Sequence, residues 1–440
     1  MANTFLTKTF ASDSNRKTWT WSAWIKRSGL GGIQTLMTQV DGWSGNGNAG
    51  FYIIGDQLTS YNITASLNSG TDSYNRPSRY LRDVNGFYHI VVRLDTTQST
   101  ASNRCRWYVN GEQLTDFVYA NYPSLNQDCN FNGGDPHGIG SHTAGANYFD
   151  GVMSYINFSD GYSYAPTVFG STDSTTGEWT INTNPTFTLG THGFTILKNG
   201  NTITDQSTNS NNWSLGGGTL TNTLDCPANV FATWNPLSAL STPPTFSNGN
   251  TTAAVPTSGG AFRSTLAASS GKYYCEVKVT SLNNAAVGIQ PIDSAYNVSI
   301  FGDTSGIGLY GTNGEVYKNG SNIGAVASVS NNDIIGMAID LDNNNIYFSV
   351  NGQYASGLSG SWNQSFGSAY AVAINSGHAY TIAGVNGSSG TTSNISINFG
   401  NGTFGTSAVT SAGTPGSTPG TFEYDVPSGY EPLTTKGLNA

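Results

Sequence analysis

The chain is poor in charged residues, and this scarcity excludes several protein classes. Only 10% of its 440 residues are Asp, Glu, Lys or Arg, against about 25% in an average domain. With six Glu in all, long helices and coiled coils are not expected. The 17 basic residues are outnumbered by 26 acidic ones, so no nucleic-acid-binding surface is expected. The densest basic cluster, Arg76, Arg79 and Arg82, is interpreted as a solvated loop.

Cysteines and long apolar runs are also scarce. The four cysteines, Cys105, Cys129, Cys226 and Cys275, include no CxxC pair, so a zinc site of the usual spacing is not expected. We interpret them as free residues that pack as small hydrophobic groups, with a Cys105–Cys129 disulfide left open. No stretch of 18 apolar residues exists and the N-terminus has no apolar signal core, so neither membrane insertion nor a signal peptide is expected.

Glycine and aromatic residues, by contrast, are abundant. The chain has 55 Gly, and 12% of its residues are aromatic. Residues 18–26 alternate, with Trp19 and Trp21 on one face, as in a β-strand. Asn110-Gly111 follows a similar run and predicts a hairpin, because type I′ turns need positive φ at both central residues. The predicted fold class is therefore all-β, with strands separated by polar turns.

The composition changes along the chain and predicts four parts. The second part is too poor in apolar residues to form a large core of its own, and the last is rich in Gly, Ser, Thr and Pro. The predicted parts are a sandwich at 1–165, an irregular connector at 166–245, a second sandwich at 246–402, and a flexible linker with a docking tail at 403–440. We expect Tyr430 and Leu433 to dock in that tail.

An ordered set of motifs in the first part resembles a known family. The motifs are Trp-Ser-Ala-Trp at 21–24, Tyr-His-Ile-Val-Val at 88–92, Trp-Tyr-Val-Asn-Gly at 107–111 and Phe-Asp-Gly-Val-Met at 149–153. Together they resemble a laminin-G-like or concanavalin-A-like domain. The resemblance implies a two-sheet jelly roll.

A second set of motifs resembles an SPRY domain. It comprises Gly-Lys-Tyr-Tyr-Cys-Glu-Val at 271–277, Gly-Met-Ala-Ile-Asp-Leu-Asp at 336–342 and Ile-Tyr-Phe-Ser-Val-Asn-Gly at 346–352. The resemblance implies another jelly-roll-type β-sandwich. Between the two sandwiches, Asp-Cys-Pro-Ala-Asn-Val-Phe-Ala-Thr at 225–233 resembles a segment of structural proteins of marine tailed bacteriophages. That resemblance implies a virion protein.

The sequence offers little for catalysis or metal binding. Glycoside hydrolysis needs two carboxylates that flank the sugar bond, and no such pair is evident in a strand, so we expect no enzyme activity. His137 and His142 lie near Asp135 in a Gly-rich stretch that we interpret as an exposed loop. Asp135 and Asp150 are the candidate Ca²⁺ ligands, since Ca²⁺ prefers oxygen ligands; no other cofactor is expected.

Sugar binding remains as a candidate activity, because aromatic rings stack on sugar faces. The candidate glycan-binding residues in the first sandwich are Trp43, Tyr61, Tyr74 and Tyr80. Many aromatic residues will also serve only as core or interface residues.

These observations lead to a hypothesis with two alternatives. We expect a non-enzymatic bacteriophage virion protein on the particle exterior, made in the host cytoplasm, that attaches to the host surface or its glycans as part of a tail fibre, knob or appendage. Its expected partners are other virion proteins, host-surface glycans and further copies of itself in a homo-oligomer. The alternative is a capsid decoration or cement protein that binds neighbouring subunits. A polysaccharide-degrading enzyme is less favoured.

Overall fold

A computed structural model describes the chain as two compact units, unit 1 (Met1–Thr221) and unit 2 (Asn222–Ala440). The described residues are 3–40, 48–61, 74–142, 145–198, 200–238, 243–256, 260–281, 285–294, 301, 306–311, 313–386, 392–410 and 413–439. Within them, regular structure consists of strands and short 3-10 turns, which confirms the all-β prediction. No helix in this part of the chain is long and apolar enough to cross a membrane.

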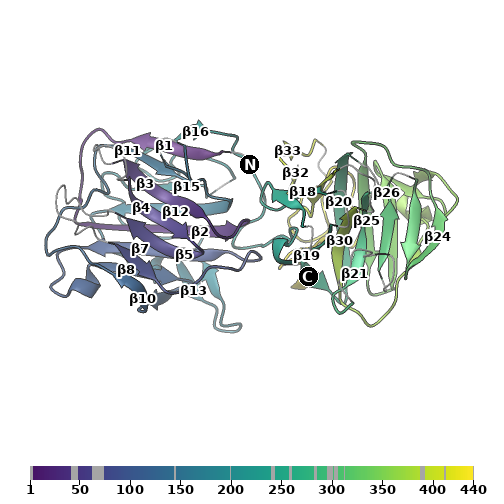
Figure 1. Cartoon of the computed structure of the whole chain (residues 1–440), viewed down its shortest axis with the longest axis horizontal. Coiled ribbons are helices and arrows are strands. Elements are labelled where there is room, and N and C mark those ends of the chain that lie inside the picture. Colours follow the sequence, from purple (N-terminus) through teal and green to yellow (C-terminus); the bar gives the residue numbers. More distant parts are fainter. Residues whose placement is uncertain are drawn as a thin grey trace. The chain divides into compact units, whose positions relative to one another are not determined.

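Unit 1 contains two large antiparallel sheets (Figure 1). The eight-stranded sheet has the order β10 (Phe117–Ala120), β6 (Asn75–Pro77), β5 (Gln57–Tyr61), β4 (Asn48–Ile54), β3 (Ile33–Val40), β11 (Pro136–Ile139), β1 (Phe5–Thr9) and β16 (Ser214–Gly217). The six-stranded sheet has the order β15 (Phe194–Ile196), β12 (Gly151–Asp160), β2 (Thr18–Arg27), β7 (Tyr88–Asp95), β8 (Cys105–Val109) and β9 (Glu112–Leu114). A two-stranded ribbon joins β13 (Gly170–Thr172) and β14 (Trp179–Ile181).

The core of unit 1 lies between these sheets. Trp19 and Trp21 of β2 are fully buried, as their alternation predicts. Their ring centroids lie 5.5 and 5.7 Å from that of Phe51 on β4, in the opposite sheet. Each buried side chain of this size contributes about 2–3 kcal/mol of transfer free energy, so the facing aromatic residues hold the sandwich together.

The aromatic residues of the predicted connector pack into the cores of the two units, as expected for a segment without a large core of its own. Phe194 lies in β15, which pairs with β12, and Trp213 packs on Phe194 with ring centroids 5.1 Å apart. Phe231 and Trp234 are instead buried in the core of unit 2. The predicted boundaries at 165 and 245 therefore differ from the division at 221/222. Isolated aromatic residues in a polar segment can join an existing core without any periodic pattern.

Unit 2 is also built from two large sheets (Figure 1). The larger follows the order β17 (Thr245–Ser247), β18 (Thr252–Val255), β31 (Ser393–Asn398), β20 (Lys272–Ser281), β25 (Ile334–Asp340), β26 (Asn345–Val350), β27 (Gln353–Ala355) and β28 (Trp362–Gln364), with β29 (Val372–Ala373) on β26 and β34 (Glu431–Pro432) on β20. The smaller follows β19 (Ala261–Ala268), β30 (Tyr380–Asn386), β21 (Ala285–Pro291), β22 (Ile307–Tyr310), β23 (Glu315–Lys318) and β24 (Ser321–Ala325). A short ribbon pairs β32 (Thr403–Phe404) with β33 (Ser407–Ala408).

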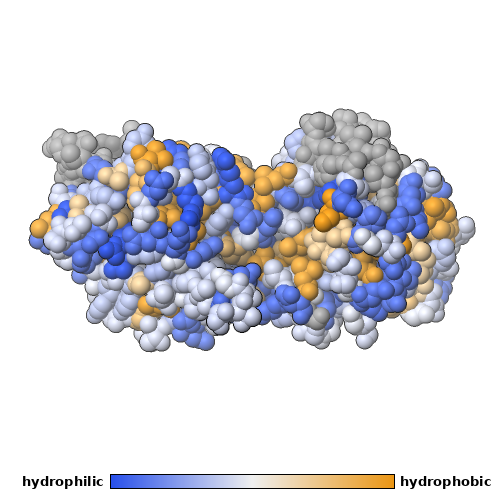
Figure 2. All heavy atoms as spheres, turned by 90° about the horizontal axis from the view of Figure 1, so that it is seen from below, coloured by the Kyte–Doolittle hydropathy of each residue, from blue (hydrophilic) through white to orange (hydrophobic). Residues whose placement is uncertain are grey.

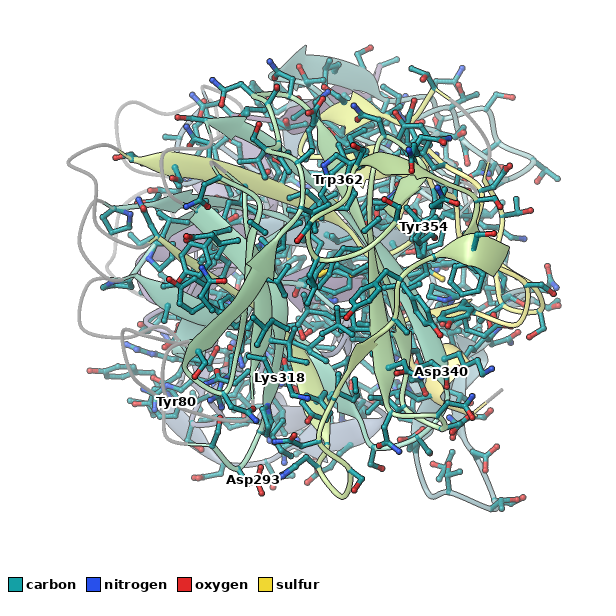
Figure 3. The ribbon with its side chains drawn as sticks, turned by 90° about the vertical axis from the view of Figure 1, so that its right-hand side faces the viewer. Tyr80, Asp293, Lys318, Asp340, Tyr354 and Trp362 are labelled. Atoms are coloured by element: carbon teal, nitrogen blue, oxygen red, sulfur yellow. The ribbon has the colours of Figure 1, made fainter. Side chains whose placement is uncertain are left out.

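The tail of unit 2 packs against the larger sheet. Phe422 is fully buried and its ring centroid lies 5.0 Å from that of Tyr274 on β20. Tyr430 and Leu433 are also buried, in line with the expected docking. The preceding stretch, predicted as a flexible linker, instead forms backbone bridges, such as Gly413 with Phe422. Figure 3 labels Asp340, Tyr354 and Trp362, which come from β25, β27 and β28 of this sheet.

One buried carboxyl group holds this tail in place. Glu276 on β20 is fully buried, and its carboxylate accepts hydrogen bonds from the backbone N–H groups of Glu423 and Tyr424, both at 2.8 Å. Asn398 contributes a longer bond of 3.4 Å. Burial outweighs these bonds and raises the pKa of Glu276 to about 7. The attachment of the tail therefore depends on a group that titrates near neutral pH.

Candidate functional site

A row of outward-facing side chains runs along one segment of unit 1. In residues 74–82, Asn75, Pro77 and Leu81 are buried, and the intervening even-numbered residues are half-buried or exposed. Successive side chains of a strand point to opposite faces, so Arg76 and its even-numbered neighbours lie on the outer face of β6 (Asn75–Pro77). Tyr80 and Arg82 follow beyond the end of this strand and are exposed, as is Arg79. We call the even-numbered residues of this segment the tyrosine–arginine row: Tyr74, Arg76, Ser78, Tyr80 and Arg82.

A further tyrosine joins the row from the neighbouring strand. Tyr119 of β10 pairs with Arg76 of β6 in the sheet register, so both side chains lie on the same face. The Tyr119 ring centroid lies 5.1 Å from that of Tyr74, and the residue is 53% exposed. Sequence reasoning missed Tyr119; the short apolar run at 117–120 was the available signal, but the register that brings it to Tyr74 is not readable locally.

Tyr80 is held by a contact with Arg82. The Arg82 guanidinium lies 4.2 Å from the centre of the Tyr80 ring, a cation–π geometry. The Tyr80 backbone also forms a bridge with Gln57 of β5. Tyr80 is nevertheless 50% exposed, so part of its ring is accessible to a ligand while its backbone is fixed by the bridge. Its side chain is labelled in Figure 3.

A buried ion pair supports the row from within the unit. The Asp56 carboxylate accepts hydrogen bonds from Arg27 Nη1 at 3.1 Å, Arg82 Nε at 3.3 Å and the Gly31 N–H at 2.6 Å. Burial alone would raise the pKa of Asp56, but these donors outweigh it and hold the pKa below its ordinary value. Arg27 is fully buried, whereas the Arg82 side chain is 61% exposed. Asp56 thus fixes Arg82 on a rigid base while its outer edge stays open.

The structure brings together two of the four predicted glycan-binding residues. Tyr74 and Tyr80 both lie on the tyrosine–arginine row. Tyr61 is the last residue of β5, but its side chain, like all of Trp43, lies outside the described residues. The interpretation of the arginine cluster as a solvated loop is wrong for Arg76, which lies in β6 and is half-buried. Arg79 and Arg82 lie beyond the end of this strand at Pro77 and are exposed.

The predicted Ca²⁺ ligands do not form a cluster. Asp135 is exposed, and burial raises the pKa of the half-buried Asp150 carboxyl, which disfavours the charged form that Ca²⁺ requires. Within the described ranges, no group of three His, Cys, Asp or Glu could hold a metal ion. The exposed-loop interpretation is wrong for His137, which is buried with its ring centroid 5.2 Å from that of Phe10.

A buried serine–histidine contact in unit 1 is not arranged for nucleophilic catalysis. Trp179 Nε1 donates to His89 Nδ1 at 2.9 Å, so the neutral ring carries its proton on Nε2. Nε2 then donates to Ser22 Oγ, 2.8 Å away. A general base would have to accept a proton from the serine. Burial also lowers the pKa of His89 to about 3.

All four cysteines are free.

Comparisons with known proteins agree with the sandwich architecture. Residues 3–168 match the family model described as the Concanavalin A-like lectin/glucanases superfamily, which confirms the predicted resemblance of the first sandwich. A search of curated proteins finds no match.

Structures similar to the chain include two SPRY domains and a pentraxin. The SPRY domain of human HERC1 is 17% identical, with 37% of this chain and 96% of that one covered and a TM-score of 0.31. The PSpry domain of TRIM65 is 14% identical over 38% and 91%, with a TM-score of 0.30. A heptameric SAP-like pentraxin from Limulus polyphemus is 14% identical over 37% and 72%, with a TM-score of 0.28. These TM-scores are too low to support an argument about function.

Proposed function

We propose that unit 1 binds carbohydrate through the tyrosine–arginine row and Tyr119. The observation that carries this proposal is the pair of half-exposed tyrosine rings, Tyr119 on the edge strand β10 and Tyr80 at an isolated bridge to Gln57 of β5. Rigid aromatic rings provide contact area at a low cost in conformational entropy. Sites built on strands are also more precise than sites on loops.

Two further observations support a binding role without catalysis. The lectin/glucanase family match covers the residues that form the row. The acids along it are committed to other contacts: Asp56 is shared by two arginines, Glu112 lies 2.8 Å from Arg79, and Asp116 accepts a hydrogen bond from Ser78. A glycosidase needs one carboxyl group free to protonate the leaving group. The proposed activity is therefore carbohydrate binding by a protein that is not an enzyme.

The proposed setting is the exterior of a bacteriophage particle, where the protein attaches to host-surface glycans. It is supported by the resemblance of residues 225–233 to phage structural proteins. Figure 2 shows a surface in which hydrophilic residues alternate with hydrophobic patches. We propose that further copies of this chain and other virion proteins cover some of these patches. Labelling the protein on intact particles in electron micrographs tests this setting, and its absence from the particle would reject it.

Exchanging the exposed tyrosines for alanine should abolish most of the binding. With a ligand found on a glycan array, we expect Tyr80→Ala and Tyr119→Ala each to lower the affinity at least about tenfold, because each removes a stacking ring. Isothermal titration calorimetry measures the change. Both residues are exposed, so the free energy of unfolding should change by less than about 0.5 kcal/mol.

Tyr162 provides the matched control. It is 44% exposed and follows β12 of the six-stranded sheet rather than the row. Tyr162→Ala should leave the affinity unchanged. An equal loss in Tyr162→Ala, or an array on which no glycan is bound, contradicts the proposed function.

A further inference from the structure

The tail covers a group of aromatic residues on the outer face of the larger sheet of unit 2. Tyr274 of β20 and Tyr354 of β27 (Figure 3) are buried there together with Phe422 and Tyr430 of the tail. We call these four residues the aromatic cluster. It is separate from the main core of the unit, so it can be uncovered while the main core stays closed.

The covering segment is anchored at both ends. Phe399 before it and Leu433 after it are buried in the main core, and the Leu433 carbonyl oxygen accepts a hydrogen bond from the Ala232 N–H at 3.0 Å. We call residues 421–432, which lie between these anchors and include β34, the strap. A segment held at its two ends can detach from the surface beneath it without unfolding of the whole unit.

The strap is attached to β20 through the carboxylate of Glu276. This carboxylate accepts hydrogen bonds from the N–H groups of Glu423 and Tyr424, both at 2.8 Å, and from the Tyr274 hydroxyl at 3.3 Å. The Asn398 side chain donates a further bond of 3.4 Å. All four donors are neutral, so they offset only part of the cost of burying a charge on Glu276.

The titratable groups that face Glu276 are three tyrosines and one further glutamate: Tyr274 on β20, Tyr354 on β27, and Tyr424 and Glu423 on the strap. Burial raises the pKa of each tyrosine, so all three stay neutral between pH 5 and 8. The Glu423 carboxylate accepts a hydrogen bond from the Thr410 N–H at 2.7 Å. The register partners of Glu276 on β25 and β31 are Gly336 and Asn398, which do not titrate.

We infer that the strap is a pH-sensitive cover that opens locally as the pH rises and exposes the aromatic cluster. Opening lets water reach the Glu276 carboxylate, which then ionises at its ordinary pKa. In the closed state, burial raises the pKa of Glu276 from 4.5 to about 7. Closure is therefore most stable below pH 4.5 and weakens as the pH rises through 7, and the ratio of open to closed strap changes by up to about 300-fold. The inference concerns unit 2 and does not rest on the proposed carbohydrate site of unit 1.

Hydrogen exchange on the full chain, followed by mass spectrometry, tests this local opening. Peptides of the strap are compared with peptides of β25, and the intrinsic exchange rate at each pH is divided by the measured rate to give a protection factor. We expect the protection of the strap to fall at least about thirtyfold from pH 5 to pH 8 and to stay below that of β25 at both pH values. Equal protection of the strap and β25 at both pH values would mean that the strap opens only when the unit unfolds, and would overturn the inference.

Glu276→Gln and Glu431→Gln form a matched pair of variants. Glu276→Gln removes the titrating group, so the protection of the strap should change less than about threefold between pH 5 and pH 8. Glu431 also lies on the strap, and its carboxylate accepts hydrogen bonds from the N–H groups of Ser417 and Thr418. Burial alone would raise the pKa of Glu431, but these bonds outweigh it and hold the pKa below its ordinary value. Glu431→Gln should therefore keep the pH dependence of the wild type.

The outcomes decide the inference without reference to unit 1. A wild-type strap whose protection does not vary with pH, or a pH dependence that persists in Glu276→Gln, would overturn it. If Glu276→Gln does not fold, the wild-type profile and its comparison with β25 still decide, because neither needs that variant. Carbohydrate binding is measured separately, so either result leaves the proposed function as it stands.

Discussion

Raising the pH from about 4.5 to 7 is expected to destabilise unit 2 by about 3 kcal/mol through Glu276. Burial raises the pKa of this carboxyl from 4.5 to about 7 in the folded protein. Between these values the folded protein holds a proton that the unfolded chain has released. The stabilisation is complete below pH 4.5 and is lost as the pH rises through 7. Urea unfolding at a series of pH values measures this slope.

Glu276→Gln isolates the contribution of this one carboxyl group. Glutamine does not titrate. It keeps one acceptor oxygen but places an NH₂ group where the second oxygen was, so one of the N–H groups of Glu423 and Tyr424 loses its acceptor at every pH. Asp340 and Glu431 have pKa values below their ordinary values, because hydrogen bonds outweigh burial, so neither titrates in this window. We expect the difference in slope between wild type and Glu276→Gln to account for the 3 kcal/mol, which is about 2.5 pKa units at 1.36 kcal/mol each. Parallel slopes contradict this prediction.

Asp56→Asn should destabilise unit 1 by about 3–5 kcal/mol, because it leaves the buried Arg27 without its counter-charge. The substitution adds no backbone strain, because residue 56 has a φ of 68° and Asn readily adopts this left-handed region. Asparagine also keeps an acceptor for the Gly31 N–H. Urea unfolding followed by tryptophan fluorescence measures the loss.

Two comparison variants distinguish a buried charge from a general disturbance. Arg82→Gln removes the exposed partner of Asp56 and should cost less than about 1 kcal/mol, as exposed ion pairs do. The double variant Arg27→Met with Asp56→Asn removes both buried charges and should be more stable than Asp56→Asn alone. A cost below 1 kcal/mol for Asp56→Asn would mean that Asp56 does not support Arg27 as described.

Strand-level features could be predicted from the sequence, and contacts between distant segments could not. The alternation at Trp19 and Trp21 indicates a buried face, and the structure confirms it. Trp213 gives no such signal, because a single aromatic residue in a polar segment has no period. Tyr74 and Tyr80 could be named as candidates from residue type alone. The ring contact between Tyr74 and Tyr119 depends on strand register. The ion pair between Arg82 and Asp56 depends on how the chain between them folds back.

The docking of Tyr430 and Leu433 agrees with the prediction, whereas the flexibility predicted for the stretch before them does not. Gly, Ser, Thr and Pro are typical of flexible linkers, and composition says nothing about a partner elsewhere in the chain. Here the partner is Glu276, about 150 residues earlier, whose buried carboxylate fixes two consecutive backbone N–H groups. The sequence signal for this contact is Glu276 itself, because a glutamate in an otherwise apolar strand needs hydrogen-bond donors from elsewhere in the chain.

The late position of the tail has a consequence for biosynthesis. β20 is complete at Ser281, yet Phe422 and Tyr430, which cover its outer face, are translated about 150 residues later. At about 5–20 residues per second, a ribosome needs roughly 10–30 s for that stretch. During this interval Tyr274 and the Glu276 carboxyl lack this cover, and Glu276 lacks part of the burial that raises its pKa. We therefore expect closure of the tail over Glu276 to be a late step of folding that is coupled to proton uptake.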